Sequence, residues 1–189
     1  MEIEKEVRYQ INKDTIEKIS EETKEYIPRD EMLDITCGYN GFDSYSIYKY
    51  ICRVRKKGNH CSLEVKNYSN EQECVEQSIT LNDARDGINY LKLIGMKPYL
   101  YLKRYREVRK YKDLKIFIDE FDILGDFVEI EYQDSKDSKK TVEEFLNIIK
   151  IKEEPKEMYG DIVKKKLKED VKFKELFESN LEEILKGKF

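Results

Sequence analysis

Charged residues at every second position are the feature that most limits how this chain can fold. Such runs occur at Glu4-x-Glu6-x-Arg8, Arg53-x-Arg55, Glu64-x-Lys66, Arg104-x-Arg106 and Glu129-x-Glu131. Residues two apart in an extended strand point to the same face. The residues between these charges are mostly apolar, as Val54 and Val65 are. The spacing therefore predicts several strands that each carry one charged and one apolar face.

A charged face has an ordinary explanation, because antiparallel sheets often expose one face to solvent. Three properties of the whole set favour a different interpretation. Charges of the same sign are adjacent on one face, as at Arg104 and Arg106, although such neighbours repel. Arginine predominates over lysine at the paired basic positions, and its planar fork suits phosphate. The acidic pairs suit hard cations. Together these properties predict a sheet face that encloses a multiply charged ligand.

A triphosphate fits this combination of charges, because burying its roughly four negative charges needs cations from the protein and from metal ions. We expect six basic side chains to bind it, namely Arg8, Arg53, Arg55, Lys66, Arg104 and Arg106. We expect Mg²⁺ or Mn²⁺ to be held by five carboxylates, namely Glu4, Glu6, Asp119, Glu129 and Glu131. For Asp119 and Lys66 taken alone, a solvated surface position is the alternative.

The composition narrows the class of protein. The chain has 189 residues, with 14 Tyr and 8 Phe that argue against disorder despite 40% charged residues. Its net charge of −4 argues against a long-range field that attracts nucleic acid. No apolar run approaches the roughly 20 residues of a membrane span, and the acidic N-terminus lacks the apolar region of a signal peptide. A cytoplasmic protein without membrane contact is expected.

The cysteines and the histidine exclude several chemistries. Cys37, Cys52, Cys61 and Cys74 form no C-x-x-C pair, and we expect free, partly buried thiols. The single histidine, His60, follows Gly58-Asn59 and is interpreted as a hairpin residue. Mechanisms that need a Ser-His or Cys-His pair, or several His ligands, are therefore disfavoured.

The order of expected elements is mainly strands with a few helices. Strands are expected at 2–11, 49–56, 61–67, 73–81, 99–110, 114–121 and 126–133, and the segment 31–50 is expected to be rich in turns. Helices are expected at 15–26, 84–93 and 142–151, the last with a capping box from Thr141 after a loop at 133–140. A charged helical tail begins at Tyr159.

This order predicts an α+β fold, namely a closed or nearly closed antiparallel barrel of about eight strands with flanking helices. We expect a tunnel domain at residues 1–165. A helical extension at residues 166–189 is expected to pack on or beside it.

The motifs, taken in order, resemble the CYTH superfamily, also called triphosphate tunnel metalloenzymes. The matching segments are Glu4-Lys5-Glu6-Val7-Arg8, Arg53-Val54-Arg55, Leu63-Glu64-Val65-Lys66, Lys103-Arg104-Tyr105-Arg106, Ile118-Asp119-Glu120, Leu124 to Glu131, and Met158-Tyr159-Gly160-Asp161. The resemblance implies a charged tunnel in an eight-stranded barrel, with Arg8 and Lys66 acting in catalysis. It also implies two metal ions, one bridging phosphate oxygens and one activating the nucleophile.

Two departures from the family pattern bear on activity. Arg8 replaces the opening lysine, and the two side chains are not equivalent at a crowded phosphate site. The family often has Arg-x-Glu in the strand after the one that holds Lys66, but here no basic residue lies between Asn67 and Asp83. The sequence leaves open whether Glu73 or Glu76 faces the tunnel.

The resemblance implies three candidate functions. The first is metal-dependent hydrolysis of tripolyphosphate, thiamine triphosphate, a nucleoside triphosphate or an RNA 5′-triphosphate end. The second is a class IV adenylate cyclase, which converts ATP to cyclic AMP and pyrophosphate. The third is a non-catalytic phosphate-binding module, which the two departures keep open. Hydrolysis is favoured because cyclisation also needs an adenosine pocket that no segment identifies. A small-molecule triphosphate is the expected partner, and a homodimer is an option.

Overall fold

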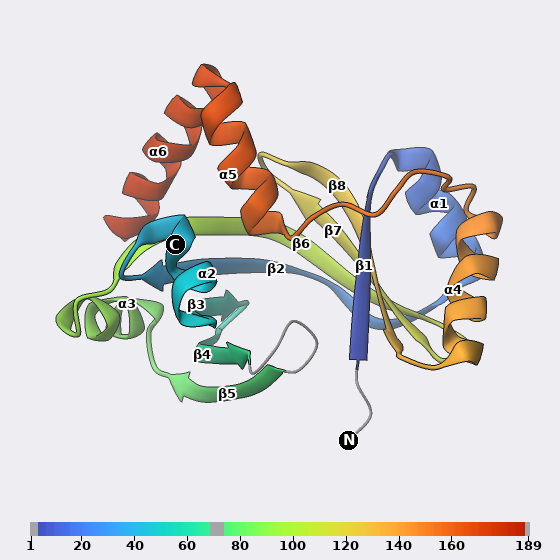
Figure 1. Cartoon of the computed structure of the whole chain (residues 1–189), viewed down its shortest axis with the longest axis horizontal. Coiled ribbons are helices and arrows are strands. Elements are labelled where there is room, and N and C mark those ends of the chain that lie inside the picture. The colour runs from blue at the N-terminus through green and yellow to red at the C-terminus, as the bar shows by residue number, and fades with distance from the viewer. Residues whose placement is uncertain (1–3, 69–73, 188–189) are drawn as a thin grey trace. The chain divides into compact units, whose positions relative to one another are not determined.

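The computed structural model describes residues 4–68 and 74–187, with the backbone alone at Glu4, Tyr68 and Cys74. The chain forms two compact units (Figure 1). Unit 1 consists of Met1–Glu31 and Arg104–Met158, and unit 2 of Met32–Lys103 and Tyr159–Phe189. The sequence predicted a tunnel domain at residues 1–165 and a helical extension at 166–189. That division differs from the two units and stays a prediction.

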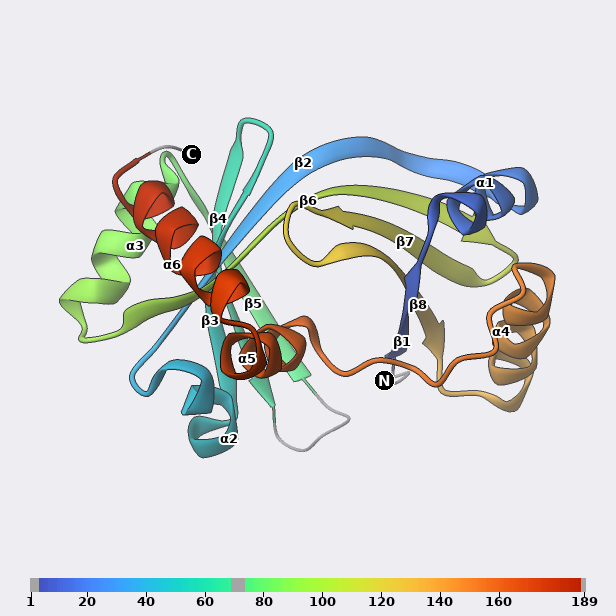
Figure 2. The same ribbon diagram turned by 90° about the horizontal axis from the view of Figure 1, so that it is seen from above.

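The strands of the described chain form one eight-stranded sheet in the order β1-β8-β7-β6-β2-β3-β4-β5. The two longest strands, β2 (Lys24–Gly38) and β6 (Lys97–Tyr111), are neighbours and contribute residues to both units (Figure 2). The predicted α+β class, with an eight-stranded antiparallel sheet and flanking helices, is confirmed. Closure of the sheet into a barrel stays a prediction.

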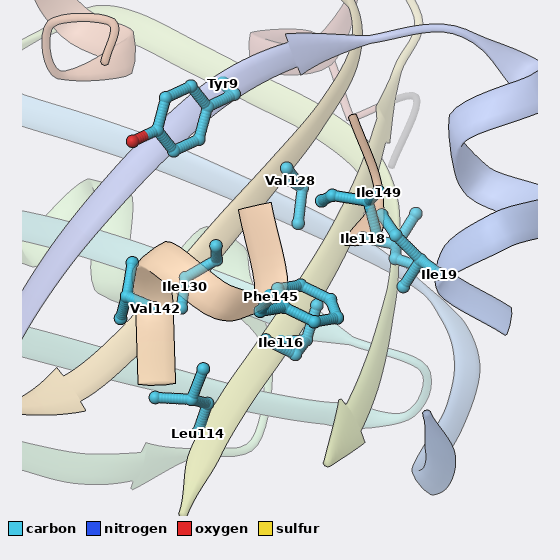
Figure 3. Close-up of a cluster of buried hydrophobic side chains, with 10 residues drawn as sticks. All are labelled: Tyr9, Ile19, Leu114, Ile116, Ile118, Val128, Ile130, Val142, Phe145 and Ile149. Atoms are coloured by element: carbon cyan, nitrogen blue, oxygen red, sulfur yellow. The ribbon is translucent and has the colours of Figure 1, made fainter. Parts of the chain in front are cut away.

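Unit 1 has its core between one sheet face and two helices. The strands are β1 (Glu4–Ile11), β7 (Leu114–Phe121), β8 (Gly125–Gln133) and the later part of β6, and the helices are α1 (Lys13–Glu22) and α4 (Lys136–Ile148). Alternate strand residues point to the helices because side chains in a strand alternate between faces. Figure 3 shows the buried side chains that meet there: Tyr9, Ile19, Leu114, Ile116, Ile118, Val128, Ile130, Val142, Phe145 and Ile149.

Unit 2 is built on β3 (Tyr50–Lys57), β4 (His60–Tyr68) and β5 (Cys74–Leu81). Helix α3 (Ala84–Leu93) packs on these strands and buries Ile88 and Leu91. The packing is close at Gly87, where a Cβ atom would lie 2.9 Å from Cγ2 of Val54. The short helices η1 (Gly41–Asp43) and α2 (Ser44–Tyr48) lie between β2 and β3.

The helical tail is two helices, α5 (Tyr159–Glu169) and α6 (Val171–Leu185), which contact each other (Figure 2). They separate at Asp170, whose side chain accepts a hydrogen bond from the Phe173 amide at 3.0 Å and so caps α6. Within unit 2, the Phe177 ring stacks on the buried Tyr101 ring at 4.8 Å. The side-chain amide of Asn180 donates to the Tyr101 hydroxyl at 2.9 Å. These contacts fix α6 to β6.

The prediction for residues 15–50 is wrong in two respects. Helix α1 ends at Glu22, so residues 24–26 of the expected helix belong to strand β2, and so do residues 31–38 of the segment that was expected to be rich in turns. The first part of β2 is mostly exposed, while every residue from Met32 to Gly38 is buried. Leu33, Ile35 and Cys37 alternate with Asp34 and Thr36, but this pattern spans only five residues and follows an exposed half without alternation, so the sequence gives a weak strand signal. Pro28 precedes the stretch that pairs with β3, which begins at Met32.

The prediction for the start of the helix near Thr141 is also wrong. Helix α4 begins at Lys136, and its N-cap is Ser135, whose hydroxyl accepts from the Ser138 amide at 3.1 Å. The Thr141 hydroxyl instead donates to the Asp137 carbonyl inside the helix at 3.0 Å. The first turns of α4 are mostly polar and exposed, so their composition looked like that of a loop.

Two smaller predictions are confirmed. Cys37, Cys52 and Cys61 are buried free thiols, while the side chain of Cys74 lies outside the described residues. His60 begins β4 opposite Lys57 in the β3–β4 hairpin. Among residues 4–68 and 74–187, the helices are all too short or too polar to cross a membrane.

Candidate functional site

The predicted site residues of unit 1 share the sheet face opposite the hydrophobic core. Arg8 lies opposite Glu129 in the β1–β8 ladder, and Arg106 lies opposite Asp119 in the β6–β7 ladder. Residues paired in this way point to the same face. By the same register the position of Glu4 falls on this face, opposite Gln133, but its side chain lies outside the described residues. The spacing of the charges therefore predicted their common face correctly.

Arg8 is a buried arginine between two carboxylates. Its Nε atom donates to Oε2 of Glu129 at 2.9 Å, and its terminal nitrogen donates to Glu6. The Glu129 carboxylate also lies 3.3 Å from a terminal nitrogen of Arg106. Charge-assisted hydrogen bonds of this kind fix the plane of each guanidinium group.

Asp119 is the centre of the charged face in unit 1. Its side chain is 0% exposed. Both of its oxygens accept from Arg106, and Nε of Arg104 lies 3.2 Å from Oδ1. A buried carboxylate needs such partners. The structure thus shows Asp119 positioning two arginines, and its predicted role as a metal ligand stays a prediction.

The sequence prediction omitted Lys115 on β7. Its ammonium group is ion-paired with Glu131, which lies opposite it in the β7–β8 ladder. The sequence could have identified Lys115 as a site residue. It precedes Asp119 by four residues on the same strand and therefore shares its face. The structure therefore brings Glu131 to a lysine as well as to the face that holds Glu129.

The predicted basic residues of unit 2 also share one sheet face. Arg53 lies opposite Glu64 and Lys66 lies opposite Glu76, while Arg55 lies opposite Asp34. The carboxylates complete a set of basic and acidic side chains that we call the unit 2 charged face: Asp34, Arg53, Arg55, Glu64, Lys66 and Glu76. The open question about the strand after Lys66 is answered for Glu76, which faces this set, while Glu73 lies outside the described residues.

None of the three carboxylates of this face was predicted from the sequence as a site residue, and the reason differs for each. Asp34 lies in the part of β2 that the sequence did not predict as a strand. Glu64 was read only as part of the alternating pattern. Glu76 lies within the segment without basic residues, and its face depends on the register of β4 with β5.

Ion pairing changes the acidities of this face. Burial alone would lower the pKa of Arg53, but the nearby Asp34 and Glu64 carboxylates raise it above its usual value. Burial alone would raise the pKa of Glu76, but the hydrogen bond from Lys66 holds it below its usual value. Both shifts keep the groups charged.

Every predicted phosphate-binding cation is already paired with a carboxylate of its own unit. In unit 1 the pairs involve Arg8, Arg104 and Arg106. In unit 2 they involve Arg53, Arg55 and Lys66. An anion that binds these cations must therefore displace a carboxylate or arrive with a cation of its own.

The metal-binding capacity of the described side chains is limited. Within that part of the chain, no group of three or more His, Cys, Asp or Glu residues is arranged to hold a metal ion. Glu6, Glu129 and Glu131 nevertheless lie on one face, and all offer the oxygen ligands that hard cations prefer. Mg²⁺ is often held by one or two carboxylates together with substrate phosphates and water, so this donor set fits such an ion.

Solved structures with this fold include proteins of Pyrococcus furiosus, Vibrio parahaemolyticus and Hippeastrum. A hypothetical protein of Pyrococcus furiosus is 20% identical, with a TM-score of 0.70 over 84% of this chain and 98% of that chain. A candidate adenylate cyclase of Vibrio parahaemolyticus is 15% identical, with a TM-score of 0.66 over 86% of this chain and 98% of its own. A candidate adenylyl cyclase of Hippeastrum, described as having a dominant triphosphatase activity, is 16% identical, with a TM-score of 0.61 over 86% and 94% of the two chains.

At these identities the likeness establishes the fold alone. No curated protein matches the chain. The CYTH domain model matches residues 44–159, which is more than half of the chain and includes β3 to β8. This match agrees with the ordered motifs and with the eight-stranded antiparallel sheet. The chain belongs to the CYTH domain family.

Proposed function

We propose that the protein is a metal-dependent hydrolase of a triphosphate substrate, namely tripolyphosphate, thiamine triphosphate or a nucleoside triphosphate. One observation carries the proposal. Each unit gathers basic side chains on a single sheet face and holds them there with buried carboxylates. Such preorganised cations suit phosphoryl transfer, in which positioning and charge stabilisation supply most of the catalysis.

The basic residues have a common role in this proposal. Arg8, Arg53, Arg55, Lys66, Arg104 and Arg106 contact phosphate oxygens and stabilise the charge that builds up during transfer. Arginine suits this role because its fork can donate two parallel hydrogen bonds. Arg8 and Lys66 are the groups that we assign to the reacting phosphates. Arginine at position 8 keeps the positive charge of the family's lysine and offers more hydrogen-bond donors to a phosphate group.

The charge balance explains a requirement for metal. Because the six cations are paired with carboxylates, a triphosphate needs further positive charge. A bound Mg²⁺ or Mn²⁺ supplies that charge at the phosphate oxygens. We assign Glu4, Glu6, Glu129 and Glu131 to hold two such ions. Asp119 could join them only by releasing Arg106, since both of its oxygens accept from that residue.

Cyclisation of ATP is the second candidate, and the Vibrio structure is described as a candidate adenylate cyclase. Hydrolysis is favoured because the Hippeastrum protein, also described as a candidate cyclase, has a dominant triphosphatase activity. The proposal also includes four features predicted from the sequence. They are closure of the sheet into a barrel, a cytoplasmic location, a small-molecule partner and, as an option, a homodimer.

Product analysis of the full chain tests the proposal. The protein is incubated with Mg²⁺ or Mn²⁺ and with tripolyphosphate, thiamine triphosphate or ATP. Release of orthophosphate supports hydrolysis. Pyrophosphate with cyclic AMP from ATP identifies the cyclase. Tight triphosphate binding without either product identifies the non-catalytic module.

A further inference from the structure

The two arginines of the Arg53-x-Arg55 strand are held differently. Arg55 donates from Nε and from a terminal nitrogen to the two oxygens of Asp34, at 2.7 and 2.9 Å. Its fork is therefore occupied. Arg53 donates from Nε to Glu64 at 2.6 Å. Its terminal nitrogens lie 3.9 Å from Asp34 and 3.7 Å from Glu76, beyond hydrogen-bond distance. The terminal nitrogens of Arg53 can therefore donate to a ligand, whereas two nitrogens of Arg55 already donate to Asp34.

Two of the three carboxylates on this face are fixed supports. The side chains of Asp34 and Glu64 are only 3% and 8% exposed. The second oxygen of Glu64 accepts from the Ser62 hydroxyl at 3.0 Å. Removing either carboxylate would leave a buried arginine with too little negative charge, which is costly. An incoming anion therefore cannot displace them easily.

Glu76 is different because it approaches the same cations from the exposed side. Its side chain is 43% exposed, and its Oε2 atom lies 2.9 Å from Nζ of Lys66. Its Oε1 atom lies 3.7 Å from a terminal nitrogen of Arg53. A half-exposed ion pair contributes little free energy, since water screens it. An anion with more charge can replace it.

We propose that Glu76 is a displaceable counter-ion that occupies an anion subsite formed by Lys66 and the fork of Arg53, and that Glu64 is a positioning residue for that fork. A phosphate oxygen enters where the Glu76 carboxylate lies, and the released carboxylate turns to solvent. This inference takes its ligand class from the proposed function, but its test requires no turnover.

The proposal predicts opposite changes in anion affinity when Glu76 and Glu64 are each neutralised. A simple effect of net charge predicts the same change for both. If only net charge matters, neutralising either glutamate strengthens anion binding. If Glu76 competes with the ligand and Glu64 holds Arg53, Glu76→Gln strengthens binding and Glu64→Gln weakens it. The substitution is the same and both residues lie on one face, so each variant is the matched control of the other.

Isothermal titration calorimetry of the full chain with tripolyphosphate, in EDTA and well below the melting temperature, measures the effect. We expect the Kd to fall about fivefold in Glu76→Gln and to rise about fivefold in Glu64→Gln, the scale of one ion pair. Sulfate serves as a second probe. Glu144→Gln removes an exposed ion pair with Lys112 in unit 1 and should leave both affinities unchanged.

If Glu64→Gln does not fold, Glu76→Gln is compared with Glu144→Gln, which removes the same charge in unit 1: tighter binding in Glu76→Gln alone supports the proposal, and equal tightening in both contradicts it. An unchanged or weaker affinity in Glu76→Gln, or shifts of the same sign in Glu76→Gln and Glu64→Gln, would overturn it. So would a wild-type protein that binds neither probe at millimolar concentration. Opposite shifts in a protein that hydrolyses no triphosphate would support this subsite and refute the proposed function.

Discussion

The charged faces of the two units use the same kinds of side chain but bury them differently. In unit 1 the central carboxylate, Asp119, is fully buried and shared by Arg104 and Arg106. In unit 2 the buried carboxylates serve Arg53 and Arg55, while Lys66 depends on the half-exposed Glu76. Buried ion pairs fix geometry, and exposed ones exchange easily.

The faces also differ in how their carboxylates are spaced. Unit 1 carries Glu129 and Glu131 on one strand, opposite Arg8 and Glu6. The acidic residues of unit 2 each lie on a different strand, namely β2, β4 and β5. Paired carboxylates suit a hard cation. We therefore expect the metal ions to bind in unit 1, beside phosphate-binding arginines, and the face of unit 2 to bind phosphate without a metal ion of its own. Four predictions can break or sharpen that division.

The largest effect is expected at Asp119. Asp119→Asn leaves the buried Arg104 and the partly buried Arg106 without their shared carboxylate, so we expect the free energy of unfolding to fall by about 3–5 kcal/mol. Urea denaturation measures it. Glu144→Gln is the control and should not change the midpoint measurably. A midpoint for Asp119→Asn equal to that of the wild type would show that the face of unit 1 is not held by this residue.

Loss of a metal ligand comes next. Glu129→Gln and Glu4→Gln should each reduce metal-dependent turnover about 100-fold, because a neutral amide binds a hard cation weakly. Circular dichroism should show a folded protein in both cases. Unchanged turnover in both variants would contradict the assignment of these residues.

The two arginines of β3 should respond differently to lysine. Arg53→Lys removes the presented fork, so we expect the KM for the triphosphate to rise about tenfold with little change in stability. Arg55→Lys breaks the two hydrogen bonds to Asp34, so its main effect should be on the urea midpoint. Steady-state kinetics and denaturation of both variants test this. The reverse pattern would exchange their roles.

The effect that is smallest at neutral pH is the loss of stability of unit 2 at alkaline pH. Burial raises the pKa of Cys37 from its ordinary 9.0 to about 12. The unfolded thiol then loses its proton at a lower pH than the folded one. Stability should therefore fall as pH rises from about 9 toward 12, by up to about 1.4 kcal/mol per pH unit.

Urea unfolding at pH 7.5, 9.5 and 10.5 measures this dependence. Cys37→Ala should flatten it in part, and the remainder reflects other groups whose pKa burial raises, among them Cys52 and Tyr99, the latter to about 12. An identical slope in the wild type and in Cys37→Ala would show that the thiol does not contribute.

The common face of the charges could be predicted because a strand has a strict period of two. That rule placed Arg104 with Arg106, and Glu129 with Glu131, on one face of their strand without any knowledge of the fold. The partners of each cation could not be predicted, because they depend on register between strands far apart in sequence. Asp34 and Arg55 are 21 residues apart, and Arg8 and Glu129 are 121 apart.

The elements that were missed also have a physical cause. From Met32 to Gly38 strand β2 is buried on both faces, and the first turns of α4 are mostly polar and exposed. In β2 the alternation of apolar and polar residues covers only residues 33–37 and runs directly into the turn-forming residues Gly38, Asn40 and Gly41, and the first turns of α4 show no apolar helical period. Asp34 was missed for this reason, and with it the residue that separates the roles of Arg53 and Arg55.

The central claim is that these charged faces bind a triphosphate together with a divalent cation and hydrolyse it. Orthophosphate release from tripolyphosphate, measured for the wild type with Mg²⁺ or Mn²⁺, with EDTA, and for Glu129→Gln with metal, tests it most directly. We predict release by the wild type with metal, and little release in EDTA or by Glu129→Gln. Release that persists undiminished in EDTA, or no release from any triphosphate with either metal, would contradict the account.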